Sequence, residues 1–226
     1  DGQGALALTD SANLFAWIKF YRAARSGGIK PLLGVDAWIS NPADRERPFR
    51  ALLLVRNRTG YRNLCQLLSR AWLDNEWRGR GEIDRDWFDA LSLDSQGDHG
   101  LIALSGAHHG DVGVALTAGN LEAAADLALK WEARFPGAFY LELQRTGQPQ
   151  VEAHVRAAAT LAARLGLPVV ATHPVQFLAR DDFRAHEARV CIAEGEILAN
   201  PRRVSRFAET QYFLSLIHIS EPTRPY

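Results

Sequence analysis

The strongest constraint on the fold is a β-α-β pattern close to the start of the sequence. The segment from Ala5 to Ser40 reads ALALTDSANLFAWIKFYRAARSGGIKPLLGVDAWIS, in which an apolar run, a helical pattern and a second apolar run follow one another. Each apolar run ends in a carboxylate, Asp10 after the first and Asp36 after the second. Parallel α/β folds bind ligands and metals at the carboxyl ends of their strands, because the loops there converge on one face. The pattern therefore predicts both a fold class and the edge of the sheet where chemistry would take place.

Short β-rich runs alternate with longer helical runs along the whole chain. The expected strands are Ala5–Thr9, Ile29–Ile39, Phe49–Val55, Gly100–Ser105, Phe139–Leu143 and Pro168–Ala171. The expected helices are Asn13–Ser26, Thr59–Asp74, Asp84–Leu91, Asp111–Thr117, Leu121–Arg134, Pro149–Leu165 and Asp181–Glu194, and the expected loops are 41–48, 75–81 and 106–110. This rhythm predicts an α/β fold with a mostly parallel sheet. Since no glycine-rich phosphate loop follows the first strand, a barrel is favoured over a Rossmann fold.

Composition narrows the class of protein. The 226 residues are 47% hydrophobic, enough for one large or two small domains, and 26 basic residues balance 26 acidic ones. Such a balance argues against a segment that grips nucleic-acid phosphates. Aromatic residues such as Trp17 and Phe20 recur at helical spacing, which favours core packing over a base-stacking groove.

The cysteines and the apolar runs bear on the compartment. Cys65 and Cys191 lie far apart in apolar helical contexts, which predicts buried free thiols. No apolar run approaches the roughly 20 residues of a membrane helix, and no signal peptide is present. A cytoplasmic protein without membrane contact is expected. The chain has no Met and begins Asp1-Gly2, so we expect an internal fragment of a longer protein, with removal of a leader as the alternative.

Polar residues gather at the predicted strand ends and in the loop after the fourth strand. They are Asp10, Asp36, Ser105, His108, His109, Glu142 and His173. Carboxylates and imidazoles that converge on one barrel mouth are the usual ligands of a multinuclear metal site. Plainer roles are open for each: Asp10 as a helix cap, Glu142 as a partner of Arg145, and the histidines as ordinary loop residues. Motifs for a nucleophile elbow, a P-loop, an H-E-x-x-H zinc site and a Cys-x-x-Cys site are absent from the sequence.

The segment 5–39 resembles the N-terminal PHP (polymerase and histidinol phosphatase) domain of bacterial DNA polymerase III alpha subunits, on the replicative branch. The resemblance continues from Gly4 to about Leu214, through NRTGYRNLCQLLSRA, EIDRDWF, GLIALSGAHHGDVG, FYLELQRTGQP, GLPVVATHPVQFL and DFRAHEARVCIAEG. It implies a distorted, TIM-like (β/α)7 barrel. The family's opening His-x-His motif would precede Asp1, so the barrel in this chain would lack its first strand.

Departures from the family pattern fall on the ligand positions. Metal-binding members carry His where this chain has Ser11, Glu at Asp36 and Cys at Ala107, and they read Asn-Asp-Val-His at 173–176, which is His-Pro-Val-Gln here. Proline has no side-chain donor atom, and Ser and Gln are poorer ligands than His. The resemblance therefore implies a metal-free relic without catalytic residues. Its vestigial site candidates are Asp10, Asp36, His108, Glu142, His173 and His186.

The resemblance also implies a function. The parent protein would extend DNA by nucleotidyl transfer at paired palm aspartates with Mg²⁺, all outside this chain. The PHP domain would be an inactive scaffold that contacts the rest of the alpha subunit and docks the proofreading exonuclease subunit, while other domains bind most of the DNA. A neutral, apolar-rich segment fits such a docking role. The alternative is a metal-dependent PHP phosphoesterase or pyrophosphatase that binds Zn or Mn, with His108 or His109 as substitute ligands. An error-prone paralogue of the alpha family is a third reading.

The C-terminal end departs from the family as well. After Ser215 the chain reads LIHISEPTRPY, which resembles a translated sequencing-adapter read-through, with a lineage-specific tail as the alternative. We therefore expect a PHP domain over residues 1–215, truncated at its N-terminus, and a non-native, poorly packed tail over 216–226.

Overall fold

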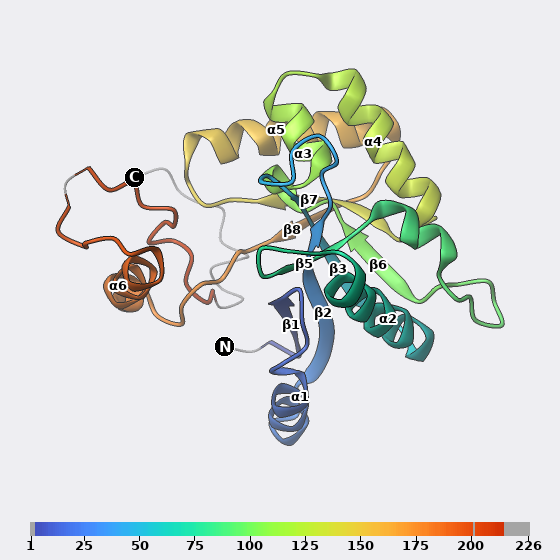
Figure 1. Ribbon diagram of the computed structural model, residues 1–226, viewed down its shortest axis with the longest axis horizontal. Coiled ribbons are helices and arrows are strands. Elements are labelled where there is room, and N and C mark those ends of the chain that lie inside the picture. The colour runs from blue at the N-terminus through green and yellow to red at the C-terminus, as the bar shows by residue number, and fades with distance from the viewer. Residues whose placement is uncertain (1–2, 201, 215–226) are drawn as a thin grey trace.

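The computed structural model describes residues 3–200 and 202–214 (Figure 1). The boundary expected after residue 215 and the tail 216–226 lie outside the described residues. At the other end, the Gln3 side chain donates a hydrogen bond to the carbonyl oxygen of Leu214, at 3.0 Å. The first and last described segments of the chain are therefore in contact.

Strands and helices alternate as the sequence predicts. The strands are β1 (Ala5–Ser11), β2 (Lys30–Ile39), β3 (Phe49–Val55), β4 (Glu76–Trp77), β5 (Arg80–Ile83), β6 (Leu101–Leu104), β7 (Phe139–Gln144) and β8 (Val169–Thr172). The α-helices are α1 (Trp17–Ser26), α2 (Arg58–Asp74), α3 (Asp111–Thr117), α4 (Leu121–Arg134), α5 (Pro149–Leu165) and α6 (Phe183–Glu194). Three short 3₁₀ helices are η1 (Arg85–Ala90), η2 (Ala107–His109) and η3 (Arg180–Asp182). The predicted α/β class is confirmed.

The sheet is mixed, and β3 is the reason. The strand order is β4-β5-β2-β3-β6-β7-β8, with β1 pairing to β2 as well. β3 runs antiparallel to both β2 and β6, while β1–β2, β2–β5, β6–β7 and β7–β8 are parallel. The loop 40–48 carries no helix, and a connection that short returns the chain antiparallel, because a parallel crossover needs a dozen or more residues. Within the described ranges the strand order is an open path, so closure into a barrel stays a prediction.

Two local expectations were wrong. The segment 75–81, expected to be a loop, contains the antiparallel hairpin β4–β5. Its turn residues Arg78 and Gly79 have φ of 47° and 78°, which is the geometry of a tight hairpin turn, and Arg in the first position hides the usual turn signal. The first helix begins at Trp17 rather than Asn13, since Ala12 at φ 50° redirects the backbone after β1.

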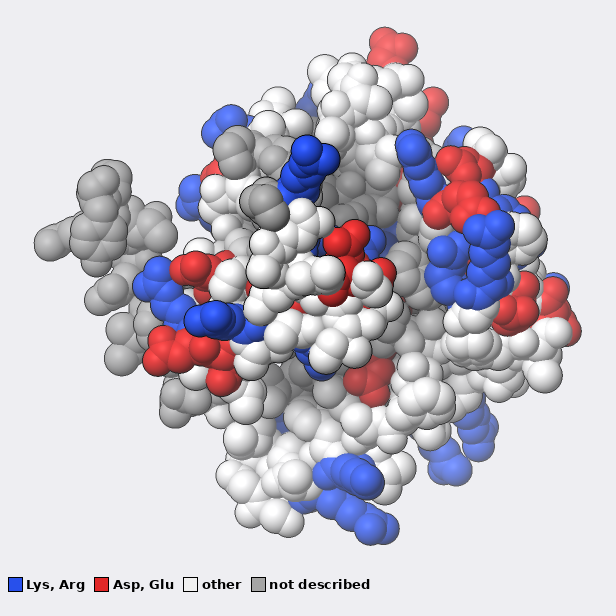
Figure 2. Space-filling view, turned by 60° about the vertical axis from the view of Figure 1, so that its left-hand side comes forward, with Lys and Arg blue, Asp and Glu red and all other residues white. Residues whose placement is uncertain are grey.

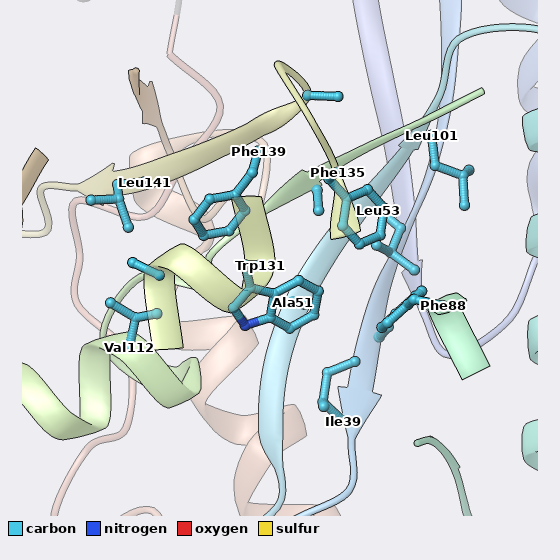
Figure 3. Packing of buried hydrophobic residues seen from close by; sticks show 14 of the residues in the cluster. Ile39, Ala51, Leu53, Phe88, Leu101, Val112, Trp131, Phe135, Phe139 and Leu141 are labelled. Atoms are coloured by element: carbon cyan, nitrogen blue, oxygen red, sulfur yellow. The ribbon is translucent and has the colours of Figure 1, made fainter. Parts of the chain in front are cut away.

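The core lies between the sheet and the helices α2 to α5, which Figure 1 shows around β3, β6 and β7. Figure 3 shows Trp131 of α4 and Phe135, the residue after this helix, against strand residues such as Phe139 and Leu53. The Trp131 and Phe139 rings are stacked, with centroids 5.9 Å apart and planes at 9°. The Trp131 indole nitrogen donates to both carboxylate oxygens of buried Asp111, at 3.0 and 3.1 Å. The core therefore combines a large apolar area with a satisfied polar anchor.

The apolar face of α2 is buried, whereas that of α1 is not. Leu64, Leu67, Leu68 and Ala71 of α2 are all in the core. In α1 only Ala24 is buried. Trp17 and Phe20 are half-buried and contact each other at a centroid distance of 6.1 Å, outside the core cluster. The expectation that they belong to the core is wrong.

Both cysteines are free thiols, as predicted. Cys191 is buried, but Cys65 is only half-buried, so the expectation of burial holds for one of the two. Among the described residues, the helices are too short or too polar to cross a membrane.

We predict that Gly60→Ala destabilises the fold. A Cβ at this position of α2 would lie 1.8 Å from the carbonyl oxygen of Gly100, which itself accepts the Arg56 amide at 2.9 Å. Alanine favours helices, so propensity alone would raise stability, whereas the backbone clash should lower the free energy of unfolding by about 1–3 kcal/mol. Urea denaturation measures the difference. Gly4→Ala is the control, since nothing lies within 4 Å of its Cβ; a stabilised Gly60→Ala protein would contradict the close contact.

Candidate functional site

A cavity of about 190 Å³ opens where the ends of several strands meet. Its walls come from β2, β3 and β7, from η2, from the start of α5, and from the segments 174–176 and 206–211. The lining residues are Asp36, Arg50, Leu52, Gly106, His108, His109, Glu142, Gln144, Thr146, Gln148, Val151, Pro174, Gln176, Arg206, Phe207 and Gln211. Three of the six vestigial site candidates, Asp36, His108 and Glu142, are therefore brought together.

Asp36 is bound by an arginine that the sequence did not single out. The Arg50 Nε donates to Asp36 Oδ1 at 2.7 Å, and Arg50 Nη2 donates to Asp36 Oδ2. Both carboxylate oxygens are thus engaged by one planar guanidinium. This bidentate form is the strongest geometry for an Arg–carboxylate pair, and each side chain keeps less than a third of its surface exposed.

Arg50 reaches the site because β3 runs backwards. A search of carboxyl-terminal strand tips finds Asp36 but overlooks Arg50, which lies near the amino-terminal end of β3. In the antiparallel register Trp38 faces Arg50 and Asp36 faces Leu52, so Asp36 and Arg50 are diagonal neighbours across the two strands. Arg50 could have been identified from the sequence only by predicting that β3 runs antiparallel to β2. The short loop before β3 is the one sequence feature that indicates this direction.

Glu142 of β7 is buried in the wall of the cavity, at 3% exposure. Its carboxylate accepts hydrogen bonds from Gln144 Nε2 at 3.0 Å and from the Thr172 hydroxyl, and its amide donates to Ser105 Oγ at 3.0 Å. Burial raises the pKa of Glu142, and the nearby negative charge of Asp36 raises it further. The alternative pairing with Arg145 is wrong, because Arg145 binds Glu152 instead, at 2.8 Å.

Two histidines line the cavity, and a third lies next to one of them. His108 and His109 of η2 both line the cavity, with ring centroids 3.9 Å apart, and His154 of α5 lies 6.1 Å from His108. Within the described residues, the buried Nδ1 atoms of His108 and His154 have no hydrogen-bond partner. Burial, followed by repulsion from His108, lowers the pKa of His154 to about 4. The cluster is therefore neutral at physiological pH.

The other three candidates lie elsewhere. The Asp10 carboxylate accepts the Ala16 amide at 3.0 Å just before α1, but no side chain in the described part of the chain caps the first turn of this helix. His173 is half-buried beside the segment 210–212 and is not among the lining residues. His186 of α6 is buried against the rings of Phe177 and Phe207, at 5.4 and 4.8 Å. The structure does not bring these three to the cavity.

The donor set of the cavity does not suit a metal ion. No group of three or more His, Cys, Asp or Glu side chains in the described part of the chain has a ligand arrangement. Asp36 is occupied by a guanidinium, and Glu142 is held by Thr172 and Gln144. A binuclear or trinuclear metal site requires carboxylates free to bridge cations, and here both oxygens of Asp36 are bound by Arg50.

We predict that stability falls between pH 6.5 and 4 partly through His154. Its folded pKa of about 4 lies below the usual value near 6.5, so the unfolded chain takes up the proton first as pH falls. Above pH ~6.5 both states are neutral, and across this window we expect a loss of about 2 kcal/mol. His154→Gln, which does not titrate, should flatten the curve of unfolding free energy against pH. Ala153→Gln on the exposed side of α5 should keep the wild-type curve; an unchanged slope in His154→Gln would contradict the assignment.

Comparison with known proteins places these features in a family. The DNA polymerase III subunit alpha of Neisseria meningitidis serogroup A is 48% identical over 215 residues, which is 94% of this chain and 18% of that protein. The Pseudomonas fluorescens subunit is 43% identical over 97% of this chain, and the Escherichia coli K12 subunit 40% over 95%. The chain spans 18% of the length of each of these relatives.

A solved structure and a family model were also matched. A metal-dependent phosphoesterase of Bifidobacterium adolescentis shares 14% identity at a TM-score of 0.37 over 75% of this chain, a similarity too weak to assign fold or function. The model of the PHP domain matches residues 1–146, more than half of the chain. This stretch contains Asp36, Arg50, the histidines of η2 and Glu142. The chain therefore belongs to the PHP domain family.

Proposed function

We propose that the chain is the PHP part of a replicative DNA polymerase III alpha subunit and that this part is a scaffold without hydrolase activity. Identities of 40–48% across nearly the whole chain support the first half of the proposal. DNA synthesis by the longer protein would then reside in parts outside this chain, where paired carboxylates hold Mg²⁺.

The observation that carries the scaffold role is the Asp36–Arg50 pair. A PHP hydrolase would need carboxylates and imidazoles arranged around metal ions, whereas here a guanidinium engages both oxygens of Asp36. Removing one partner of such a pair leaves the other charge uncompensated and lowers the stability of the fold. The pair therefore has a structural role. In this proposal the residues that line the cavity connect β2, β3 and β7 and do not bind a substrate.

The proposed partners follow from the surface charge. Figure 2 shows acidic and basic side chains interspersed in small groups on the face that it presents, without a broad basic area. Counterion release on DNA requires clustered Lys and Arg, so we assign most of the DNA contact to other domains of the subunit. We assign to this domain contacts with the rest of the alpha subunit and with the proofreading exonuclease subunit.

A second candidate is a phosphoesterase that binds Zn or Mn. The neutral imidazoles of His108 and His109 favour it, since they line the same cavity as Asp36 and Glu142. In this reading Arg50 would have to release Asp36 before a metal could enter.

We predict that the purified chain contains well under one equivalent of transition metal and does not hydrolyse p-nitrophenyl phosphate, with or without added Mn²⁺ or Zn²⁺. Elemental analysis by mass spectrometry and release of p-nitrophenol are the measurements. Asp36→Asn serves as the control, because residual phosphatase activity that survives this change comes from a contaminant. Two or three equivalents of metal with activity lost in Asp36→Asn would establish the phosphoesterase instead.

We predict that the alpha subunit to which this domain belongs forms a complex with its exonuclease subunit in the absence of DNA. Size-exclusion chromatography with light scattering would show both proteins in one peak at 0.5 M salt, since an apolar interface resists screening. Deletion of the PHP domain should abolish the shared peak. A complex that survives the deletion would assign docking to another domain.

A further inference from the structure

We propose that the Arg50 guanidinium is a built-in cation that takes the place of a divalent metal ion in the cavity and keeps such ions out. The inference deepens the proposed scaffold function, on which it rests. It assigns to one side chain the two tasks that a metal would perform there: neutralising the carboxylates and tying the strand ends together.

The position of Arg50 is determined by contacts on two sides. Its guanidinium lies over the Trp38 ring at 4.2 Å from the centroid, and its fork binds both oxygens of Asp36. Trp38 and Asp36 belong to β2, and Arg50 belongs to β3. The contacts of the Arg50 guanidinium with the Trp38 ring and the Asp36 carboxylate therefore connect the two antiparallel strands. The planar guanidinium of Arg can stack on an aromatic ring and bind both oxygens of a carboxylate at the same time. The ammonium group of Lys carries the same charge but lacks this planar geometry.

The charges around Arg50 are those that a metal ion would satisfy. Asp36 is bound directly, and the negative charge of Asp36 is felt at Glu142, so the two carboxylates are close. The positive charge of Arg50 in turn reaches His109. A fixed cation that binds Asp36 directly compensates the charge of this carboxylate from within the chain.

The same arrangement excludes divalent cations. The guanidinium group of arginine is always charged in proteins, so this positive charge is permanent. A divalent ion at Asp36 would have to displace both hydrogen bonds and would face the guanidinium at a few Å in a partly buried site. Carboxylate oxygens are the ligands that Mn²⁺ prefers, and both oxygens of Asp36 are already bound by the guanidinium.

Mn²⁺ binding to variants of the chain tests the proposal. Free Mn²⁺ gives a sharp paramagnetic resonance spectrum that is lost on binding, and thermal melting with and without Mn²⁺ reports the effect on stability. Arg50→Gln removes the charge and keeps a polar side chain, while Arg50→Lys keeps the charge. Arg56→Gln is the matched control. Arg56 directly follows β3 and forms an ion pair with Asp98, with an N–O distance of 3.0 Å, and neither residue lines the cavity.

The expected result is that Arg50→Gln melts below wild type, binds Mn²⁺ at least about tenfold more tightly and is stabilised by it. Wild type, Arg50→Lys and Arg56→Gln should show no such response. If Arg50→Gln does not fold by itself, added Mn²⁺ should restore folding, because the ion supplies the missing charge.

Two results would overturn the proposal. Arg50→Gln that responds to Mn²⁺ no more than Arg56→Gln would show that Arg50 does not occupy a cation position, and the scaffold function would stand. Stoichiometric Mn²⁺ binding by the wild-type chain would overturn both the exclusion of metals and the scaffold function.

Discussion

The pairing of β2 with β3 is the constraint on which the rest of the structure depends. β2 is hydrogen-bonded to β1 along its first part, to β5 at its end, and to β3 along its other edge. Its residues Val35, Ala37 and Ile39 point into the core, so Asp36 and Trp38 must point the other way, toward the cavity and Arg50. A slip of one residue between β2 and β3 would bury the charged pair and expose the core.

The side chains of the site compensate much of the charge that the cavity holds. Burying carboxylates such as Glu142 costs free energy unless hydrogen bonds or opposite charges compensate, and here Thr172, Gln144 and the guanidinium of Arg50 supply both. The imidazoles of His108 and His154 are instead neutral, because burial lowers the pKa of both rings. Both arrangements use only side chains of the domain, which is consistent with the scaffold role proposed for it.

Local patterns predicted most elements well and failed where a local signal was missing. α3, α4 and α5 have the bounds expected from periodicity and from turn residues. The β4–β5 hairpin was missed because Arg78 occupies a turn position that usually holds Asn, Asp or Gly. The start of α1 was placed too early because the backbone turns at Ala12, with φ 50°, and the helix begins only at Trp17. The open face of α1 shows that helical spacing of aromatic residues does not by itself establish burial.

The sequence by itself determined the alternation of strands and helices and the polar residues at strand ends. These are properties of residue type and local period, which short segments encode. Only the tertiary structure decided that Arg50 binds Asp36, that His154 lies next to His108, and that His186 belongs to another part of the molecule. The physical reason is that strand direction and cross-sheet neighbours depend on pairing between distant segments, which no local period records.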